Sequence, residues 1–272
     1  MMYFFIFIFI LILIIIILYT ILLYKFPGLF LQKDNIRYDK TDLVGSYNFL
    51  DTDEVRDVKE KIIKITSASC QSEISRNSVM STIGIPLYVD GANKHLYNIR
   101  KDRYNQLLEQ NFGWIYQKLL KKLEYITDKR CKYVDELSLP GFHVFKAGSW
   151  LGSGWSVASL HVDKQFDYIQ GYNNLDKTDV FSFTVGITLP KKSGLYIYNC
   201  TENDINVGYW PFYTYFKNKP RYKVYYEVGK LYFHDGLHYH MISEFDSKNT
   251  DRITLQGHGI WNKDKNEYII YW

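Results

Sequence analysis

The chain has 272 residues, of which 33 are Lys or Arg and 29 are Asp or Glu, and its formal net charge is +4. Because the two signs are well mixed and form no basic stripe, we do not expect a nucleic-acid-binding protein. The 25 Tyr and 17 Phe residues can supply a large aromatic core.

The chain opens with a long apolar run. From Tyr3 to Leu23 it carries no charged side chain, and this run exceeds the roughly 20 apolar residues that a helix needs to cross a bilayer. A signal peptide would have a shorter apolar region, a basic start and a small-residue cleavage site. A run this long that is apolar on every face also disfavours a buried core helix. Residues 1–25 are therefore predicted to be a transmembrane anchor.

Basic residues follow this anchor. Lys25, Lys33, Arg37 and Lys40 lie after it, whereas only the amino terminus is positive before it. Basic residues next to a span favour the cytoplasmic side of the membrane. We therefore expect a single-pass membrane protein whose C-terminal part lies in the cytosol.

Residues 26–136 are predicted to form a juxtamembrane and helical region. Apolar residues recur at helical spacing over 52–65, and Asp51 can cap the start of that helix. A second amphipathic helix is predicted over 104–127. Its charges lie mostly opposite its apolar stripe, so we expect it to pack on a sheet.

From residue 137 the chain changes to short runs rich in β-branched and aromatic residues, separated by turn signals. Strands are predicted over 141–147, 155–162, 180–189, 194–200, 222–228, 230–233, 238–243, 252–261 and 267–272. The Asp235-Gly236 pair predicts a hairpin turn. Short strands without helices between them indicate a jelly roll or related double-stranded sandwich over 137–272. The fold class is thus mainly β with flanking helices.

His161 and Asp163 stand two apart after an apolar run. On a strand they would project from the same face, so one metal ion could contact both, although such a pair alone is more often a solvated edge. A histidine from a distant strand would complete the two-His, one-carboxylate triad of non-haem Fe(II) oxygenases, which leaves coordination positions open. His240, just past the Asp235-Gly236 turn, is the best third ligand. His238, on the same strand face, is the alternative.

Arg252 opens the strand after this third ligand. Its planar guanidinium can bind a carboxylate co-substrate through two hydrogen bonds. Thr254 shares a strand face with Arg252 and can donate a further hydrogen bond. The sequence therefore predicts a carboxylate anchor beside the metal site.

The order of these motifs resembles a known family. His-x-Asp, then a Gly-containing turn before a His, then Arg-x-Thr, is the order in 2-oxoglutarate- and Fe(II)-dependent dioxygenases. The segments "VGKLYFHDGLHYHMIS" and "DRITLQGHGIW" resemble the closing part of the prolyl-4-hydroxylase-like group. The resemblance covers roughly residues 137–261, and the spacing from Gly229 and Arg252 favours His240 over His238.

This resemblance implies a double-stranded β-helix core of the jelly-roll or cupin-like kind, with Fe(II) held by His161, Asp163 and His240. It implies 2-oxoglutarate as co-substrate, bound by Arg252 with Thr254, and dioxygen as the second co-substrate. The implied reaction couples decarboxylation of 2-oxoglutarate to succinate with hydroxylation of a C–H bond. The substrate is unknown, and a prolyl or other protein side chain is one hypothesis.

Other interpretations of the same residues stay open. Phe145 stands where the family often has a Tyr that helps to hold 2-oxoglutarate. His143 is interpreted as a structural histidine of a core strand, and His258 as structural or as a neighbour of the ligands. The alternatives for the whole chain are a membrane-tethered, non-catalytic β-sandwich binding module and a cupin-like metalloenzyme that does not use 2-oxoglutarate.

Overall fold

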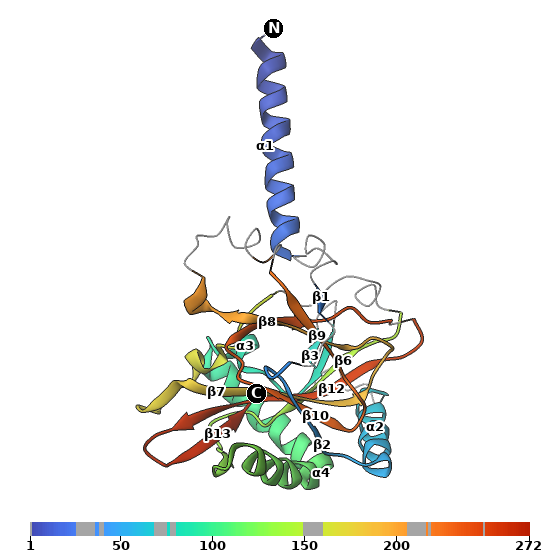
Figure 1. Ribbon diagram of the computed structural model, residues 1–272, viewed down its shortest axis with the longest axis vertical. Coiled ribbons are helices and arrows are strands. Elements are labelled where there is room, and N and C mark those ends of the chain that lie inside the picture. The colour runs from blue at the N-terminus through green and yellow to red at the C-terminus, as the bar shows by residue number, and fades with distance from the viewer. Residues whose placement is uncertain are drawn as a thin grey trace.

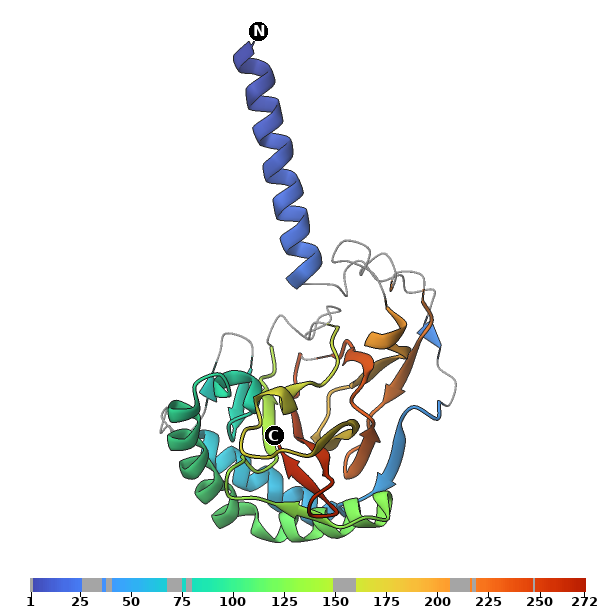
Figure 2. The same cartoon turned by 90° about the vertical axis from the view of Figure 1, so that its left-hand side faces the viewer.

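The computed structural model describes residues 2–25, 36–37, 41–67, 75–76, 80–148, 160–205, 216, 219–246 and 248–272. Strands form two sheets, long helices lie along one side of them, and α1 stands apart from both (Figures 1 and 2). Most of the strand predicted over 155–162 falls outside the described residues, which resume at Leu160.

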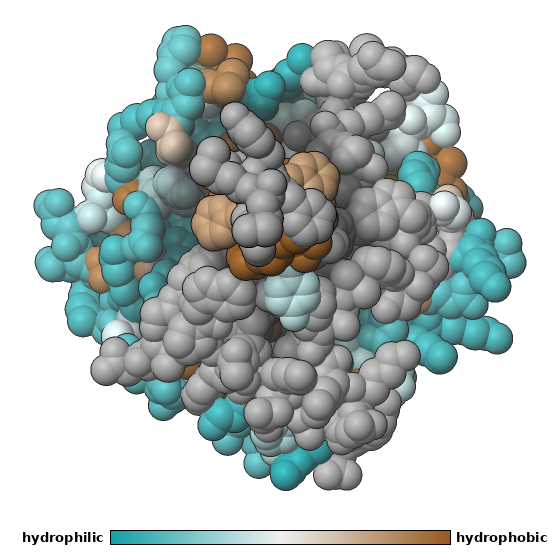
Figure 3. Space-filling view, turned by 90° about the horizontal axis from the view of Figure 1, so that it is seen from above, coloured by the Kyte–Doolittle hydropathy of each residue, from teal (hydrophilic) through white to brown (hydrophobic). Residues whose placement is uncertain are grey.

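Helix α1 spans Met2–Lys25. Its described side chains run from Phe7 to Tyr19 and are mostly exposed, with Phe9 at 68 %. Seen from above, hydrophobic side chains gather at the centre of the molecule, where α1 is viewed end-on (Figure 3). Among the described residues, no helix combines the length and the hydropathy that crossing a bilayer requires.

Two amphipathic helices pack on the larger sheet. Helix α2 (Thr52–Ser67) starts where Asp51 caps it, since the Asp51 Oδ1 atom accepts hydrogen bonds from the backbone N–H groups of Asp53 and Glu54. The short α3 spans Leu87–Asp90, and α4 spans Lys94–Thr127. The buried faces of α2 and α4 share one apolar core with the strands. The sequence predicted α2 closely, but α4 begins ten residues before the predicted 104.

The strands divide into a nine-stranded and a four-stranded sheet. The larger has the order β2-β10-β7-β12-β6-β4-β3, with β13 beside β12 and β5 beside β13, and the smaller has the order β1-β9-β8-β11. Their bounds are β1 Ile36–Arg37, β2 Gly45–Asn48, β3 Ser75–Arg76, β4 Ser81–Ile83, β5 Cys131–Tyr133, β6 Gly141–Phe145, β7 Leu175–Thr188, β8 Gly194–Thr201, β9 Arg221–Tyr225, β10 Lys230–His234, β11 His238–Ile242, β12 Arg252–Asn262 and β13 Glu267–Tyr271.

The chain passes repeatedly from one sheet to the other. Strands β6, β7, β10 and β12 lie side by side in the larger sheet, whereas β8, β9 and β11 lie in the smaller one. His161 extends the smaller sheet, because it forms an antiparallel bridge with His240. This alternation is the double-stranded β-helix, so the predicted jelly-roll core is confirmed.

The Asp235-Gly236 turn is not the hairpin that the sequence predicts. Strand β10 before it pairs with β7 and β2, whereas β11 after it pairs with β8. Gly236 does adopt the positive φ, 74°, that favours glycine. The turn carries the chain from the larger sheet to the smaller.

Candidate metal centre

Backbone hydrogen bonds place His161 and Asp163 against the start of β11. The His161 N–H donates to the His240 carbonyl at 3.1 Å, and the His240 N–H returns a bond to the His161 carbonyl at 2.9 Å. The Asp163 N–H donates to the Gly236 carbonyl at 2.8 Å. The pair and the distant histidine are therefore fixed relative to each other by the backbone, before any side chain is considered.

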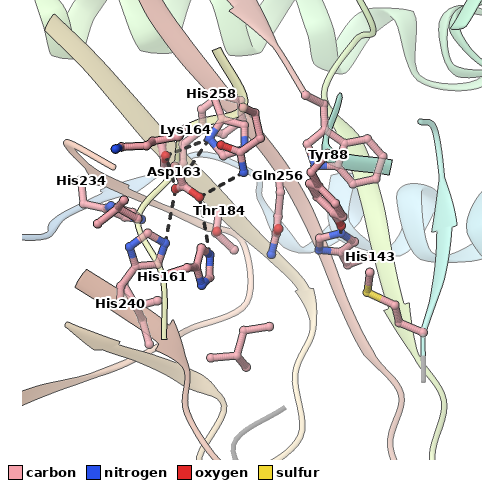
Figure 4. A pocket seen from close by; sticks show the side chains of 18 of the residues that line it. Tyr88, His143, His161, Asp163, Lys164, Thr184, His234, His240, Gln256 and His258 are labelled. Carbon is pink, nitrogen blue, oxygen red and sulfur yellow. Dashed lines mark hydrogen bonds and ion pairs between the residues drawn. The ribbon is translucent and has the colours of Figure 1, made fainter. Parts of the chain in front are cut away.

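The side chains of His161, Asp163 and His240 converge. Each offers one ligand atom, and the three atoms all lie within 4.8 Å of one another (Figure 4). The Asp163 carboxylate is 3.6 Å from the His161 Nε2 atom and 3.3 Å from the His240 Nε2 atom. Two imidazoles and one carboxylate form the donor set that suits non-haem Fe(II), so these residues fit that metal.

Further side chains hold the Asp163 carboxylate in place. The Ser182 hydroxyl donates to its Oδ2 atom at 2.5 Å and also lies 2.8 Å from the His258 Nδ1 atom. The Gln165 amide donates to the Oδ1 atom at 3.2 Å. Burial opposes ionisation of Asp163, but the neighbouring His240 and His258 outweigh it and hold the pKa of Asp163 well below its usual range. The carboxylate is thus ionised, as a metal ligand must be.

The structure separates the two candidate third ligands. The His240 Nδ1 atom lies 2.8 Å from the His238 carbonyl and donates a hydrogen bond to it, which turns Nε2 toward Asp163 as the nitrogen that faces the cluster. The His238 ring instead pairs with Asp235 at 2.6 Å, outside the cluster. Strand alternation alone cannot tell the two apart, because residues two apart share a face. The pairing of β11 with β8 shifts between His238 and His240, and this irregularity interrupts the regular pattern.

Arg252 is buried beside this cluster without a counter-ion among the described residues. It is 1 % exposed, and its guanidinium lies 5.5 Å from the Phe145 ring centre and 5.7 Å from that of Phe245. Its Nη1 atom reaches the Thr254 hydroxyl at 3.4 Å, while its Nε atom has no hydrogen-bond partner. Burial lowers the pKa of Arg252 to about 10. A buried, unpaired cation is costly, so this position fits an anionic ligand.

Tyr226 is a residue that the sequence did not single out. It follows β9, lines the same cavity as Arg252, and its hydroxyl opposes the fall in the pKa of Arg252. Phe145, where the family often has Tyr, supplies no hydroxyl. Only the fold brings Tyr226 close to Arg252, because the two residues lie in segments that never pair.

One cavity of about 670 Å³ is lined by His161, Asp163, His240, Tyr226 and Arg252, whereas Thr254 lies behind this lining. His161, Asp163 and His240 lie toward one side of it, and Tyr88, His143 and Gln256 toward the other (Figure 4). His234 and His258 also border the cavity. Burial lowers the pKa of His234 to about 3, so its ring is neutral. His143, which was interpreted as structural, and His258, which was interpreted as structural or as a neighbour of the ligands, thus both line the cavity of the predicted site.

No family model and no curated protein matches the sequence. Solved structures do match the fold. The epimerase SnoN, solved with Fe3+, alpha ketoglutarate and nogalamycin RO, is 14 % identical, with a TM-score of 0.47 over 80 % of this chain and 78 % of that one. A prolyl hydroxylase from Trichoplax adhaerens is 10 % identical, with a TM-score of 0.40 over 83 % and 86 %. A Burkholderia ambifaria N-substituted L-amino acid dioxygenase is 9 % identical, with a TM-score of 0.39 over 71 % and 86 %.

The fold is a double-stranded β-helix. The alternation of the strands between two sheets and the His-Asp-His cluster both agree with the resemblance seen in the sequence.

Proposed function

We propose that this protein is an Fe(II)- and 2-oxoglutarate-dependent dioxygenase that hydroxylates a C–H bond. One observation carries the proposal: a single cavity holds both the His161, Asp163 and His240 cluster and the buried Arg252, which has no counter-ion among the described residues. A metal site alone would not need the buried cation. A carboxylate-binding pocket alone would not need two histidines and an ionised carboxylate gathered at one point.

Each residue has a separate role in this proposal. His161, Asp163 and His240 hold the iron, and Arg252 with Thr254 binds the far carboxylate of 2-oxoglutarate. With dioxygen, the bound iron and 2-oxoglutarate supply the oxidising chemistry, which converts 2-oxoglutarate to succinate and carbon dioxide and inserts one oxygen atom into the substrate C–H bond. Phe145 and Phe245 exclude water from around Arg252, which strengthens its pairing with an anion.

The substrate belongs to the same proposal. A protein side chain, such as a prolyl residue, is supported by the likeness of the segment from Gly229 to Trp261 to the prolyl-4-hydroxylase-like group. The cavity volume of about 670 Å³ is large enough for a side chain together with the co-substrate.

We also propose that residues 1–25 anchor the enzyme in a membrane, with the catalytic part in the cytosol. The uncharged run from Tyr3 to Leu23 and the exposed apolar side chains of α1 support the anchor. The basic residues Lys25 and Lys33 support the orientation. Protease protection in sealed vesicles of known sidedness tests it, since a protected core in vesicles whose cytosolic face points outward would reverse the orientation.

An anaerobic Fe(II) titration with and without 2-oxoglutarate tests the proposed chemistry. The full chain should show a weak visible charge-transfer band only when both are present. Asp163→Ala should lose the band and Arg252→Ala should weaken 2-oxoglutarate binding, whereas Arg100→Ala, on the surface of α4, should change neither. Succinate release should fall in Asp163→Ala and in Arg252→Ala and should stay unchanged in Arg100→Ala.

The competing functions predict other outcomes of this titration. A cupin-like metalloenzyme would bind Fe(II) but not respond to 2-oxoglutarate. A non-catalytic binding module would bind neither. Either result, in protein whose folding is confirmed by circular dichroism, would overturn the proposal.

A further inference from the structure

The cavity wall contains a tyrosine hydroxyl that the proposed mechanism does not use. Tyr226 lies one residue past the end of β9 and lines the cavity together with Arg252 and Thr184. It is 9 % exposed. Its backbone N–H donates to the Ser193 carbonyl at 2.9 Å, which ties this part of the chain to the residue before β8. The position of Tyr226 in the wall is therefore fixed by the backbone.

Packing also fixes the ring of Tyr226. It stacks on the ring of Tyr232, with 4.3 Å between the ring centres and an angle of 28° between the planes. Tyr232 is itself held in place, because its hydroxyl accepts a hydrogen bond from the Glu227 backbone N–H at 2.7 Å and it pairs with Thr184 of β7. A side chain packed in this way loses little freedom when it binds a ligand.

The Tyr226 hydroxyl is an uncharged hydrogen-bond donor close to Arg252. Burial raises the pKa of Tyr226 to about 12, while Arg252 and a hydrogen bond with the Thr184 side chain oppose this rise and Asp163 adds to it. The phenol therefore keeps its hydrogen at neutral pH. Because both Arg252 and Asp163 influence this hydroxyl, it lies within electrostatic range of the buried cation and of the metal cluster.

Thr254, the hydroxyl that the sequence placed beside Arg252, does not line the cavity. It is 0 % exposed, and its oxygen accepts hydrogen bonds from the Arg252 Nη1 atom at 3.4 Å and from the Gln256 amide at 3.2 Å. Thr254 is thus placed to hold Arg252 from behind. A carboxylate offers about four acceptor sites, of which the fork of one arginine fills two. A further donor is therefore expected on the cavity side.

We propose that the Tyr226 hydroxyl donates a hydrogen bond to the far carboxylate of 2-oxoglutarate, beside Arg252. This inference rests on the proposed function, because it needs that co-substrate in the cavity, and it gives Thr254 the role of orienting Arg252. One cation and one uncharged donor match the single charge of a carboxylate. The rings of Phe145 and Phe245 flank the guanidinium, and such apolar surroundings strengthen a hydrogen bond.

Calorimetric titration of the full chain in detergent micelles tests this role. The protein is loaded with Fe(II) and kept free of dioxygen, so the measurement reports binding without turnover. 2-Oxoglutarate is compared with pyruvate, which has the same keto acid end but no far carboxylate. Tyr226→Phe should weaken binding of 2-oxoglutarate by about 10- to 100-fold, the effect of losing a hydrogen bond to a charged group. Binding of pyruvate should not change.

Tyr198→Phe is the matched control. Tyr198 is also buried, at 1 % exposure, but it does not line the cavity, so loss of its hydroxyl should change neither affinity. An equal loss of affinity for both acids in Tyr226→Phe would show that Tyr226 acts through packing. An unchanged affinity for 2-oxoglutarate would show that the hydroxyl does not contact this co-substrate. Either result overturns the proposal.

Failure of this role and failure of the oxygenase give different results. If the natural chain and Tyr226→Phe bind 2-oxoglutarate equally well and both show the charge-transfer band, only the role of Tyr226 is lost. If the natural chain binds 2-oxoglutarate no better than pyruvate and never shows the band, the proposed function is overturned together with the role of Tyr226.

Discussion

Ser182 shows how a single hydroxyl supports the proposed metal centre. It donates to the Asp163 carboxylate at 2.5 Å and lies 2.8 Å from the His258 ring, so it connects a ligand to the wall of the cavity. Groups that orient metal ligands typically change metal affinity by about 10- to 100-fold when they are removed. Ser182→Ala should therefore weaken Fe(II) binding by about this factor, as measured by anaerobic calorimetric titration.

Ser193 provides the matched control for this prediction. It is also buried, at 2 % exposure, but its hydroxyl has no hydrogen-bond partner among the described residues and it does not line the cavity. Ser193→Ala should leave Fe(II) affinity unchanged. An equal loss of affinity in both variants would show that Ser182 acts through general packing rather than through Asp163.

Glu244, which does not line the cavity of the metal centre, should make the stability of the fold depend on pH. Burial would raise its pKa, but Lys223, at 2.8 Å, and the Tyr196 hydroxyl, at 2.6 Å, outweigh burial and lower it below 4.5. A carboxyl group whose pKa is lowered by folding stabilises the fold at pH values above its pKa in the unfolded chain. This stabilisation is lost as the pH falls through its pKa in the folded protein. Glu244→Gln should thus cost about 1 kcal/mol near neutral pH, allowing for partial solvent screening.

Thermal unfolding at a series of pH values measures this effect. The difference in melting temperature between the natural chain and Glu244→Gln should be largest near neutral pH and should shrink as the pH falls below 4.5. A difference that grows on acidification would contradict the assigned sign. Lys223, whose side chain is 1 % exposed, loses its charged partner in Glu244→Gln, so the comparison measures the loss of the whole ion pair.

The residues of the proposed site differ in how far the sequence could predict them. The spacing of His161 and Asp163 and the order of His240 and Arg252 after them were enough to predict these four residues without a structure. Tyr226 does not, because only tertiary folding brings it beside Arg252. For the same reason the sequence assigned His143 to the core, since its partner Tyr88 lies 55 positions away along the chain.

At the scale of elements, close packing at Gly141 joins three segments. A Cβ atom on this β6 glycine would lie 2.0 Å from the Trp272 ring and 2.6 Å from the Ile83 carbonyl of β4. Neither the ring nor the backbone can withdraw without moving a buried strand. Gly141→Ala should therefore destabilise the protein by about 1–3 kcal/mol, a change that chemical denaturation would measure.

Gly113 of α4 is the control for this change. A Cβ atom there would meet nothing within 4 Å, and alanine lowers the entropy of the unfolded helix segment. Gly113→Ala should raise stability by about 0.5–1 kcal/mol. Opposite signs for the two glycines would show that close packing, rather than glycine content, sets the effect. A neutral Gly141→Ala would contradict the close contact with Trp272.

Local sequence patterns predicted the elements better than their partners. Short runs rich in β-branched and aromatic residues identified β6 to β13, and the Asp51 cap identified the start of α2. The short strands β2, β4 and β5 were missed, because a strand of three or four residues is defined by pairing with its neighbour rather than by its own pattern. The hairpin predicted at Asp235-Gly236 failed for a related reason, since a turn residue determines the local bend but not which sheet the next strand joins.

At the scale of the whole molecule, the chain has one part that exposes its apolar side chains and one that buries them. The residues of α1 from Phe7 to Tyr19 expose large apolar side chains, whereas the double-stranded β-helix buries its own. Exposed apolar surface of this extent marks a contact with a membrane or another protein. The first described strand of the folded part, β1, begins at Ile36, which pairs with Arg221 of β9.

Removal of residues 1–35 should therefore separate membrane binding from the chemistry. The full chain should float with phosphatidylcholine vesicles in a density gradient, because burying the apolar side chains of α1 in lipid removes them from water. The shortened chain, which keeps β1, should stay at the bottom and still develop the visible band with Fe(II) and 2-oxoglutarate. Flotation of the shortened chain would place membrane binding in the core, and loss of the band in a folded shortened chain would show that α1 supports the site.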